Sequence, residues 1–508
     1  MKRTKPVFQT ALPQYVGLPR ETEIREGRGQ YLCSDEEGLN EEQQLVFDLV
    51  VKQGKSVFFT GPAGTGKSVL LRKIIRSLAT KHLGESNRVG VTASTGLAAY
   101  NIGGTTLHRF AGIGLGQAPT TKLIRDVQKD KFKLRRWLDV RVLIVDEISM
   151  IDSILFDKLN TIARAVRGIA LPFGGIQLVL SGDFFQLPPV RKGADDGSPK
   201  FCFESKTWSS AIQQAIGLTQ IYRQRDPEFT RMLNQIREGR LSPDTIEKFR
   251  KLHRPLADNG AEATELFPLR QEADRANSKR LQNINGVAYS YCAKDGGIIK
   301  NPDTRKMLLS DCIASEFLTL KEGAQVMLIQ NVDNTLVNGS QGRIIGFANI
   351  HSFLHNRWDY DDSHASIAPP GAFEKTMDEC LPLYPVVRFA MQDGSTRVHF
   401  CQPVEWAVKR WVPDPWAVGG WVDEKLATRI QVPLLLAWAL SIHKAQGQTL
   451  HRVKVDLDRV FETGQTYVAL SRTRSMEGLQ VLNFHPSKVT AHPKVKAFYE
   501  SMSKRSGK

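Results

Sequence analysis

Ser56-Val-Phe-Phe-Thr60 runs directly into Gly61-Pro-Ala-Gly-Thr-Gly-Lys67-Ser68 near the start of the chain. The first five residues form a short apolar run, which is typical of a buried parallel strand. The next eight satisfy the phosphate-binding pattern G-x-x-x-x-G-K-[ST]. By itself the pattern also fits a glycine-rich turn, but its place between a predicted strand and a predicted helix favours a nucleotide site.

The residue types of this loop suit a nucleoside triphosphate. Glycines let backbone N–H groups wrap phosphates at a helix N-terminus, and the lysine and serine reach the β/γ oxygens and a Mg²⁺ ion. We therefore assign Lys67 to the phosphates and Ser68 to the metal. The whole loop is predicted to hold the nucleotide: Gly61, Pro62, Ala63, Gly64, Thr65, Gly66, Lys67 and Ser68.

Further strands of the same kind surround the loop. Apolar runs recur at 88–92, 140–145 and 176–180, with helical periodicity between them. Asn40 is a plausible N-cap for a helix that reaches Val50 before the first strand. Strands that alternate with helices predict a doubly wound α/β fold.

The second half of the chain is more mixed. Residues from about 318 to 428 carry short strand patterns at 324–329, 343–347, 386–389 and 397–400, broken by glycines and prolines, and α/β patterns return at 432–442 and 453–457. A small β-rich module is therefore predicted inside a second α/β unit. The expected organisation is an arm (1–38), a first unit (39–218), a second unit (219–317 and 429–485), the inserted module (318–428) and a C-terminal helix and tail (486–508).

Bulk properties narrow the class of protein. A chain of 508 residues predicts about two to four domains. A net charge of +16 and a pI near 9.5 favour a partner rich in phosphates, with an anionic membrane as the lesser alternative.

The six cysteines are scattered and form no CxxC pair. The longest apolar stretch, 433–442, is about half of the ~20 residues that a membrane span needs, and no targeting signal is readable.

A second motif supplies the carboxylates of an NTPase. Leu143-Ile-Val-Asp146-Glu147 predicts a buried strand that ends in two acidic residues, Asp146 to hold Mg²⁺ and Glu147 to polarise the attacking water. An isolated Asp-Glu pair would more often be a solvated turn. Ser181-Gly-Asp-Phe-Phe-Gln186-Leu-Pro-Pro189 follows another apolar strand, and Gln186 is placed to sense the γ-phosphate. At this point a P-loop kinase remains open.

The remaining motifs carry a family resemblance. They are Thr92-Ala-Ser-Thr-Gly-Leu-Ala-Ala99, Asn101-Ile-Gly-Gly-Thr-Thr-Leu-His108-Arg-Phe-Ala-Gly112, Asp157-Lys-Leu-Asn-Thr-Ile-Ala-Arg164-Ala-Val-Arg167, Leu218-Thr-Gln-Ile-Tyr-Arg223-Gln224, His443-Lys-Ala-Gln-Gly-Gln-Thr449 and Gly464-Gln-Thr-Tyr-Val-Ala-Leu-Ser-Arg472. From Leu39 to about Tyr499 the chain resembles superfamily-one helicases and, more closely, the eukaryotic type of the Pif-one family. Departures include Tyr222 where phenylalanine is common and Asn40 where serine is usual.

This resemblance implies two RecA-like motor domains, with a small wedge insertion near 100–120 in the first and a barrel resembling Src-homology-three folds as the inserted module. It also implies that Arg223 and Arg472 close on the γ-phosphate as arginine fingers and that Gln43 recognises adenine. Residues 157–167 resemble the family's signature helix, although their amphipathic pattern would also fit a helix with a solvated basic face.

The resemblance further implies single-stranded DNA as a partner, held by phosphate contacts and base stacking. The positions that match the family's strand-contacting motifs are Thr95, His108, Phe110, Asn338, Gly339, His443, Lys444, Gln448, Gln465, Tyr467 and Ser471.

The expected activity is that of a 5′-to-3′ DNA helicase, with ATP and Mg²⁺ as cofactors. Forked duplexes, RNA–DNA hybrids and G-quadruplexes are its implied substrates. Replication or telomere proteins are implied partners, in the nucleus and mitochondrion, with a monomer that can form a dimer on DNA. One alternative is a translocase that strips proteins from DNA without separating strands. The other, a P-loop kinase, gives Arg472 no role.

Overall fold

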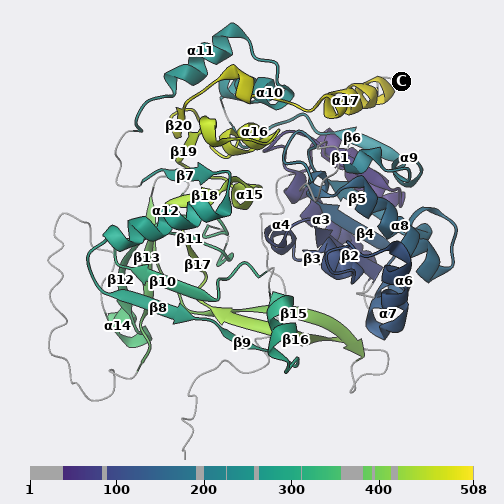
Figure 1. The fold of residues 1–508 in the computed structure, drawn as a ribbon, viewed down its shortest axis with the longest axis horizontal. Coiled ribbons are helices and arrows are strands. Elements are labelled where there is room, and N and C mark those ends of the chain that lie inside the picture. Colours follow the sequence, from purple (N-terminus) through teal and green to yellow (C-terminus); the bar gives the residue numbers. More distant parts are fainter. Residues whose placement is uncertain are drawn as a thin grey trace, which may run out of the picture.

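The computed structural model describes residues 38–506, apart from gaps at 83–87, 190–199, 225, 257–261, 310–311, 334, 356–380, 392–394 and 414–420. The predicted arm and most of the polar segment near 351–380 therefore lie outside the described residues. Three parts are visible: a parallel α/β unit that contains the P-loop, a smaller parallel α/β unit, and an antiparallel module inserted into the second unit (Figure 1).

The first unit is built on a six-stranded parallel sheet of order β3-β2-β4-β5-β1-β6. Its elements are α2 (Glu41–Phe47), β1 (Val57–Thr60), α3 (Lys67–Lys81), β2 (Val89–Ala93), α4 (Gly96–Asn101), β3 (Thr105–Thr106), α5 (Leu107–Ala111), α6 (Thr120–Lys129), α7 (Lys131–Asp139), β4 (Val142–Asp146), α8 (Ser153–Arg167), β5 (Gln177–Ser181), α9 (Trp208–Ala211) and β6 (Gln214–Gly217).

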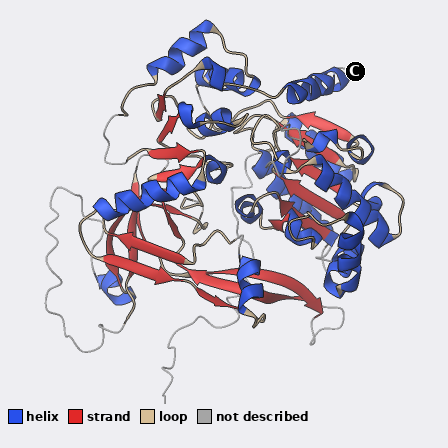
Figure 2. Ribbon diagram, viewed as in Figure 1, coloured by secondary structure: helices blue, strands red, loops and turns tan. Residues whose placement is uncertain are grey.

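Helices cover both faces of this sheet (Figure 2). The apolar runs are strands because their side chains are buried on both faces: β4 is buried at every position, and β1 likewise. Asn40 begins α2 through a capping box, in which Gln43 N donates to Asn40 Oδ1 (2.8 Å). The predicted doubly wound α/β fold is confirmed for this half of the chain.

The second unit has a four-stranded parallel sheet of order β18-β7-β19-β20. Its elements are α10 (Pro227–Glu238), α11 (Pro243–Lys251), β7 (Thr264–Phe267), α12 (Arg270–Asn283), β18 (Ala439–Ser441), α15 (Ile442–Ala445), β19 (Val453–Asp456), α16 (Gln465–Leu470) and β20 (Leu479–Leu482), followed by α17 (Pro493–Ser506).

The inserted module is antiparallel. Its two larger sheets have the orders β14-β13-β12-β11-β17 and β15-β16-β9, and β10 pairs with β8. The elements are β8 (Ala288–Cys292), β9 (Lys294–Gly296), α13 (Pro302–Leu309), β10 (Phe317–Lys321), β11 (Gln325–Leu328), β12 (Gln341–Ala348), α14 (Ile350–His355), β13 (Tyr384–Ala390), β14 (Thr396–Phe400), β15 (Val404–Pro413), β16 (Trp421–Gln431) and β17 (Leu434–Leu436).

The module is wider than the predicted range 318–428. Strands β8 and β9, which were assigned to the second unit, pair with β10 and β16, and β17 pairs with β11. Strand β8 has a weak signal in the sequence, because its side chains alternate between exposed and half-buried positions without a continuous apolar run.

The C-terminal helix returns to the first unit. In Figure 1, α17 lies beside β6 and α9. Phe498 stacks on Phe203 (centroids 4.3 Å apart) and Tyr499 stacks on Phe185 (4.8 Å). The described chain therefore leaves the first unit at its sixth strand and comes back to it after the second unit is complete.

Candidate functional site

The P-loop lies at the carboxyl edge of the first sheet, between β1 and α3. Gly64 (φ 90°) and Gly66 (φ 78°) adopt left-handed conformations that favour glycine. A Cβ at Gly64 would lie 2.5 Å from Cβ of Arg223, so this glycine is also needed for a close approach of the chain that carries the predicted finger. The loop therefore has the cradle shape that phosphates require.

Lys67 begins α3 and lies among carboxylates. Its Nζ donates to the backbone oxygens of Gly61 (2.7 Å) and Pro62 (2.9 Å). Burial lowers the pKa of Lys67, while the negative charges of nearby Asp183, Glu147 and Asp146 oppose that shift. The two carbonyl groups satisfy the Lys67 ammonium only in part, and a bound phosphate would give it an anionic partner.

Asp146 and Glu147 follow β4. Asp146 is buried, and its Oδ1 accepts a hydrogen bond from Glu147 N (2.9 Å). Glu147 has φ 52°, an uncommon conformation for a residue with a side chain. Burial, assisted by the charge of Asp146, raises the pKa of Glu147 to about 7. A carboxylate with a pKa near neutrality suits a general base.

The metal ligands predicted from sequence fit Mg²⁺ chemically. Ser68 is exposed in the first turn of α3 and offers a hydroxyl, and Asp146 offers a carboxylate. Within the described ranges, no cluster of three or more His, Cys, Asp or Glu side chains could hold a metal ion. Phosphate oxygens and water would therefore complete the coordination, which is the usual way in which proteins bind Mg²⁺.

The segment after β5 fixes Gln186 and Asp183 in the interior. Gln186 is 4% exposed, and its backbone carbonyl lies so close to Gly464 that a Cβ there would be 2.3 Å from the oxygen. Asp183 accepts two hydrogen bonds from Arg237 of α10, at 2.9 and 2.8 Å. Both contacts join the first unit to the second at the nucleotide edge.

Both predicted arginine fingers are present, but they point into protein. Arg223 Nη1 donates to the carbonyl of Ser471 (3.0 Å), and Arg472 donates from Nε to Val468 O (2.7 Å). Burial, with the charge of Arg472 nearby, lowers the pKa of Arg223 to about 9, so it still carries a positive charge at neutral pH.

Gln43 is buried beside the P-loop. Its Nε2 donates to Thr65 O (3.3 Å), and its Oε1 accepts from Asn40 N (3.3 Å). The exposed ring of Tyr222 lies on the same side, since its hydroxyl accepts from Asn40 Nδ2 (2.9 Å). In the sequence, Tyr222 stands out only as a departure from the family pattern. In the structure, its exposed ring forms an aromatic surface next to Gln43.

Four of the side chains predicted to contact DNA are buried in this structure. Phe110 packs edge-on against Trp137 in the core (5.8 Å), and Tyr467 is 3% exposed. Gln465 and Ser471 are buried as well. The Tyr467 hydroxyl accepts from Ala63 N (2.8 Å), so this residue contacts the P-loop instead of a strand. These side chains face the cores or the cleft, and the family motif gave no indication of which way they point.

The other predicted DNA contacts lie nearer the surface, with one exception. His108, His443 and Lys444 are half-buried, and Thr95 caps α4 by accepting from Ala98 N (3.2 Å). Asn338, which precedes Gly339 (φ 98°), donates to Asn101 Oδ1 (2.9 Å) and so ties the inserted module to the first unit. Gln448 is only 6% exposed.

The helix that resembles the family signature, α8, has a structural role. Lys158 donates to the backbone oxygens of Gly116 and Ala118 (2.8 and 3.0 Å), and Arg167 donates to that of Trp137 (2.6 Å). Two of its basic residues thus hold a neighbouring loop and the end of α7, and the alternative of a fully solvated basic face is wrong for them.

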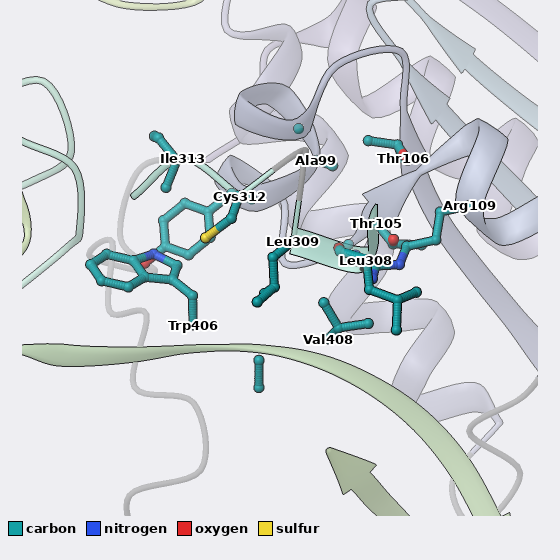
Figure 3. A pocket seen from close by; sticks show the side chains of 14 residues that line it. Ala99, Thr105, Thr106, Arg109, Leu308, Leu309, Cys312, Ile313, Trp406 and Val408 are labelled. Carbon is teal, nitrogen blue, oxygen red and sulfur yellow. Dashed lines mark hydrogen bonds between the residues drawn. The ribbon is translucent and has the colours of Figure 1, made fainter. Parts of the chain in front are cut away.

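A cavity of about 150 Å³ separates the inserted module from the first unit (Figure 3). Trp406 and Val408 of β15 and Leu309 of α13 line one side, and Thr105 and Arg109 line the other. It contains no residue of the nucleotide loop.

None of the described helices is both long and apolar enough to cross a membrane.

Comparisons with known proteins agree with this geometry. The sequence model of the "PIF1-like helicase" family matches residues 38–247, and that of "DNA helicase Pif1, 2B domain" matches 305–347. The ATP-dependent DNA helicase PIF1 of Emericella nidulans is 49% identical over 481 residues, which are 91% of this chain and 62% of that protein. The chain thus spans less than two thirds of this relative's length.

Solved structures are similar over most of the chain. The crystal structure of Pif1 helicase from Candida albicans covers 92% of this chain and 100% of that one, with 44% identity and a TM-score of 0.71. Pif1 from Bacteroides is 26% identical in complex with ADP-AlF4 (TM-score 0.71; 92% and 98% covered) and 27% identical bound to ssDNA (0.59; 93% and 98%).

Proposed function

Since the chain belongs to the PIF1-like helicase family, we propose that it is an ATP-dependent motor that moves 5′ to 3′ on single-stranded DNA and unwinds duplexes. One observation carries the proposal: the P-loop of the first unit faces arginines supplied by the chain beyond it, with Arg223 beside Gly64 and in contact with Ser471. A site divided between two units changes when the units move, which a motor requires.

The residues have separate roles in ATP hydrolysis. Lys67 binds the β- and γ-phosphates, while Ser68 and Asp146 would hold Mg²⁺, which would neutralise charge on the phosphates. Glu147 orients the attacking water and accepts its proton. Gln186 would sense the γ-phosphate, and Gln43, with the neighbouring ring of Tyr222, would contact the adenine. Arg223 and Arg472 stabilise charge that develops in the transition state.

Single-stranded DNA is the proposed track. The net charge of +16 supports phosphate binding, and Thr95, His108, Asn338, His443 and Lys444 lie outside the apolar cores. The Bacteroides relative has been solved bound to ssDNA, which supports the same class of ligand here. We further propose forked DNA, RNA–DNA hybrids and G-quadruplexes as substrates and genome maintenance in the nucleus and mitochondrion as the setting.

Strand displacement on partial duplexes with either a 5′ or a 3′ single-stranded tail tests this proposal. We expect ATP-dependent displacement only from the 5′ tail and none with Lys67→Ala. DNA-stimulated ATPase without displacement would favour a translocase that does not separate strands, and displacement only from the 3′ tail would overturn the polarity.

A further inference from the structure

The carboxylate of the proposed general base is held by a residue of the second unit. Gln446 Nε2 donates to Glu147 Oε2 at 3.0 Å, across 299 positions of sequence. Among the described residues, this is the one side-chain hydrogen bond to the Glu147 carboxylate, and Gln446 is 7% exposed. Hydrogen bonds to a charged group are stronger than neutral ones, so this contact can fix the orientation of the carboxylate.

Gln446 belongs to a turn with two faces. The buried side chains of Ile442, Ala445 and Gln446 point inward, whereas His443 and Lys444 are half-buried and Gly447 is exposed. This spacing places the basic residues on the side opposite the contact with Glu147. One turn thus presents the Gln446 amide to Glu147 on one side and the half-buried side chains of His443 and Lys444, whose pKa values are lowered by burial, on the other.

The same turn is in contact with an arginine finger. Arg472 Nη1 donates to the carbonyls of Ala445 (3.4 Å) and Gln448 (3.5 Å), and both distances are long for hydrogen bonds. If Arg472 turns toward a γ-phosphate, it releases these carbonyls, and the turn must then be held by something else. DNA phosphates against His443 and Lys444 would supply that support.

We propose that Gln446 is a positioning residue that links the DNA-facing turn 443–448 to Glu147, so that a strand bound to the turn fixes the general base for hydrolysis. The inference rests on the proposed function of this site and adds a route from DNA to the chemical step. Gln446 acts through Glu147 and touches neither DNA nor nucleotide in this role.

Substitutions of Gln446 that differ in whether the side chain can donate a hydrogen bond to Glu147 test this link. Gln446→Met keeps the length of the side chain but removes the donor, Gln446→Lys restores one, and Gln446→Glu places a second carboxylate against Glu147. With saturating oligo(dT), we expect kcat for ATP hydrolysis to fall about ten-fold in Gln446→Met, to recover at least in part in Gln446→Lys, and to be lowest in Gln446→Glu.

Other quantities separate this role from a structural one. In Gln446→Met the KM for ATP and the Kd for oligo(dT) should change less than about three-fold, while the stimulation of kcat by DNA should be nearly lost. Gln325→Met is the matched control, because Gln325 is a buried glutamine of the inserted module that donates to Ala437 O (3.1 Å). It should keep the full stimulation.

Two results would overturn the inference: stimulation by DNA that is unchanged in Gln446→Met, or an equal loss in all three variants regardless of the donor. If instead the unaltered protein shows no DNA-stimulated ATPase, the proposed function itself fails. The two failures are therefore distinguishable in one set of assays.

Discussion

The two α/β units share an architecture but differ in what their strand ends carry. In the first unit, β1, β4 and β5 end in the P-loop, the acidic pair and the segment of Gln186. In the second, β18 runs into the turn that holds Gln446, and α16 ends at Leu470, two residues before Arg472. One unit is equipped to hold a nucleotide, and the other supplies groups that reach it from outside. Changes at the nucleotide site of the first unit should affect ATP binding or hydrolysis, while changes to the arginines that reach this site from outside should affect hydrolysis but leave ATP binding nearly unchanged.

We expect the largest effect from removal of an arginine that reaches the nucleotide site from outside the first sheet. Arg223→Ala should lower kcat of DNA-stimulated hydrolysis by about 10³–10⁵, because it removes charge that stabilises the transition state. Arg223→Lys keeps the charge but loses the planar fork, and we expect it to recover only part of the rate. Steady-state ATPase with saturating oligo(dT) measures both. A loss below ten-fold in Arg223→Ala would exclude a direct role.

A change within the first unit separates binding from chemistry. Glu147→Gln should retain ATP binding but lower hydrolysis by about 10²–10⁴, since the amide cannot accept the proton of the attacking water. Binding of a fluorescent ATP analogue and single-turnover hydrolysis measure the two steps separately. Near-normal turnover would show that another group is the base.

The ion pair between the units should matter for stability. Asp183 is fully buried, and Arg237→Met would remove the arginine that pairs with its charge, at a cost of about 3–5 kcal/mol. Arg240→Met is the matched control: Arg240 pairs with Glu500 at the surface (3.3 Å), which is worth about 0–1 kcal/mol. Urea unfolding compares the midpoints. Equal shifts for the two variants would contradict a structural role for the buried pair.

The smallest expected effect concerns the return of the C-terminal helix. The Tyr499 hydroxyl lies 2.7 Å from Thr60 Oγ1 and accepts from Phe184 N (3.1 Å). Tyr499→Phe keeps the stacked ring but leaves these groups unsatisfied, and should cost about 1–2 kcal/mol. The same unfolding assay measures it, and no shift in midpoint would mean that stacking alone holds the helix.

Sequence reasoning worked where the signal is local. The P-loop and the acidic strand are contiguous motifs, and their glycines, lysine and carboxylates occupy the predicted positions because strand, turn and helix follow one another directly. It failed where partners are far apart in the chain. Nothing in the residues around Tyr499 indicates Thr60 as its neighbour, and the link from Gln446 to Glu147 exists only once two separate sheets are docked.

The direction of side chains was also beyond the sequence. Phe110 and Tyr467 lie in motifs that resemble strand-contacting segments, yet their rings are buried. Large aromatic side chains gain from burial as readily as from stacking on a base, so a motif alone does not distinguish the two.

The most direct test of a nucleotide site divided between two units compares Lys67→Ala with Arg472→Ala. A fluorescent ATP analogue reports binding, and single-turnover hydrolysis with saturating oligo(dT) reports chemistry. We predict that Lys67→Ala weakens binding at least ten-fold, whereas Arg472→Ala binds within about three-fold of the unaltered protein and hydrolyses ATP at least a hundred-fold more slowly. Normal hydrolysis in Arg472→Ala would show that the first unit is sufficient for the chemistry and would contradict the account.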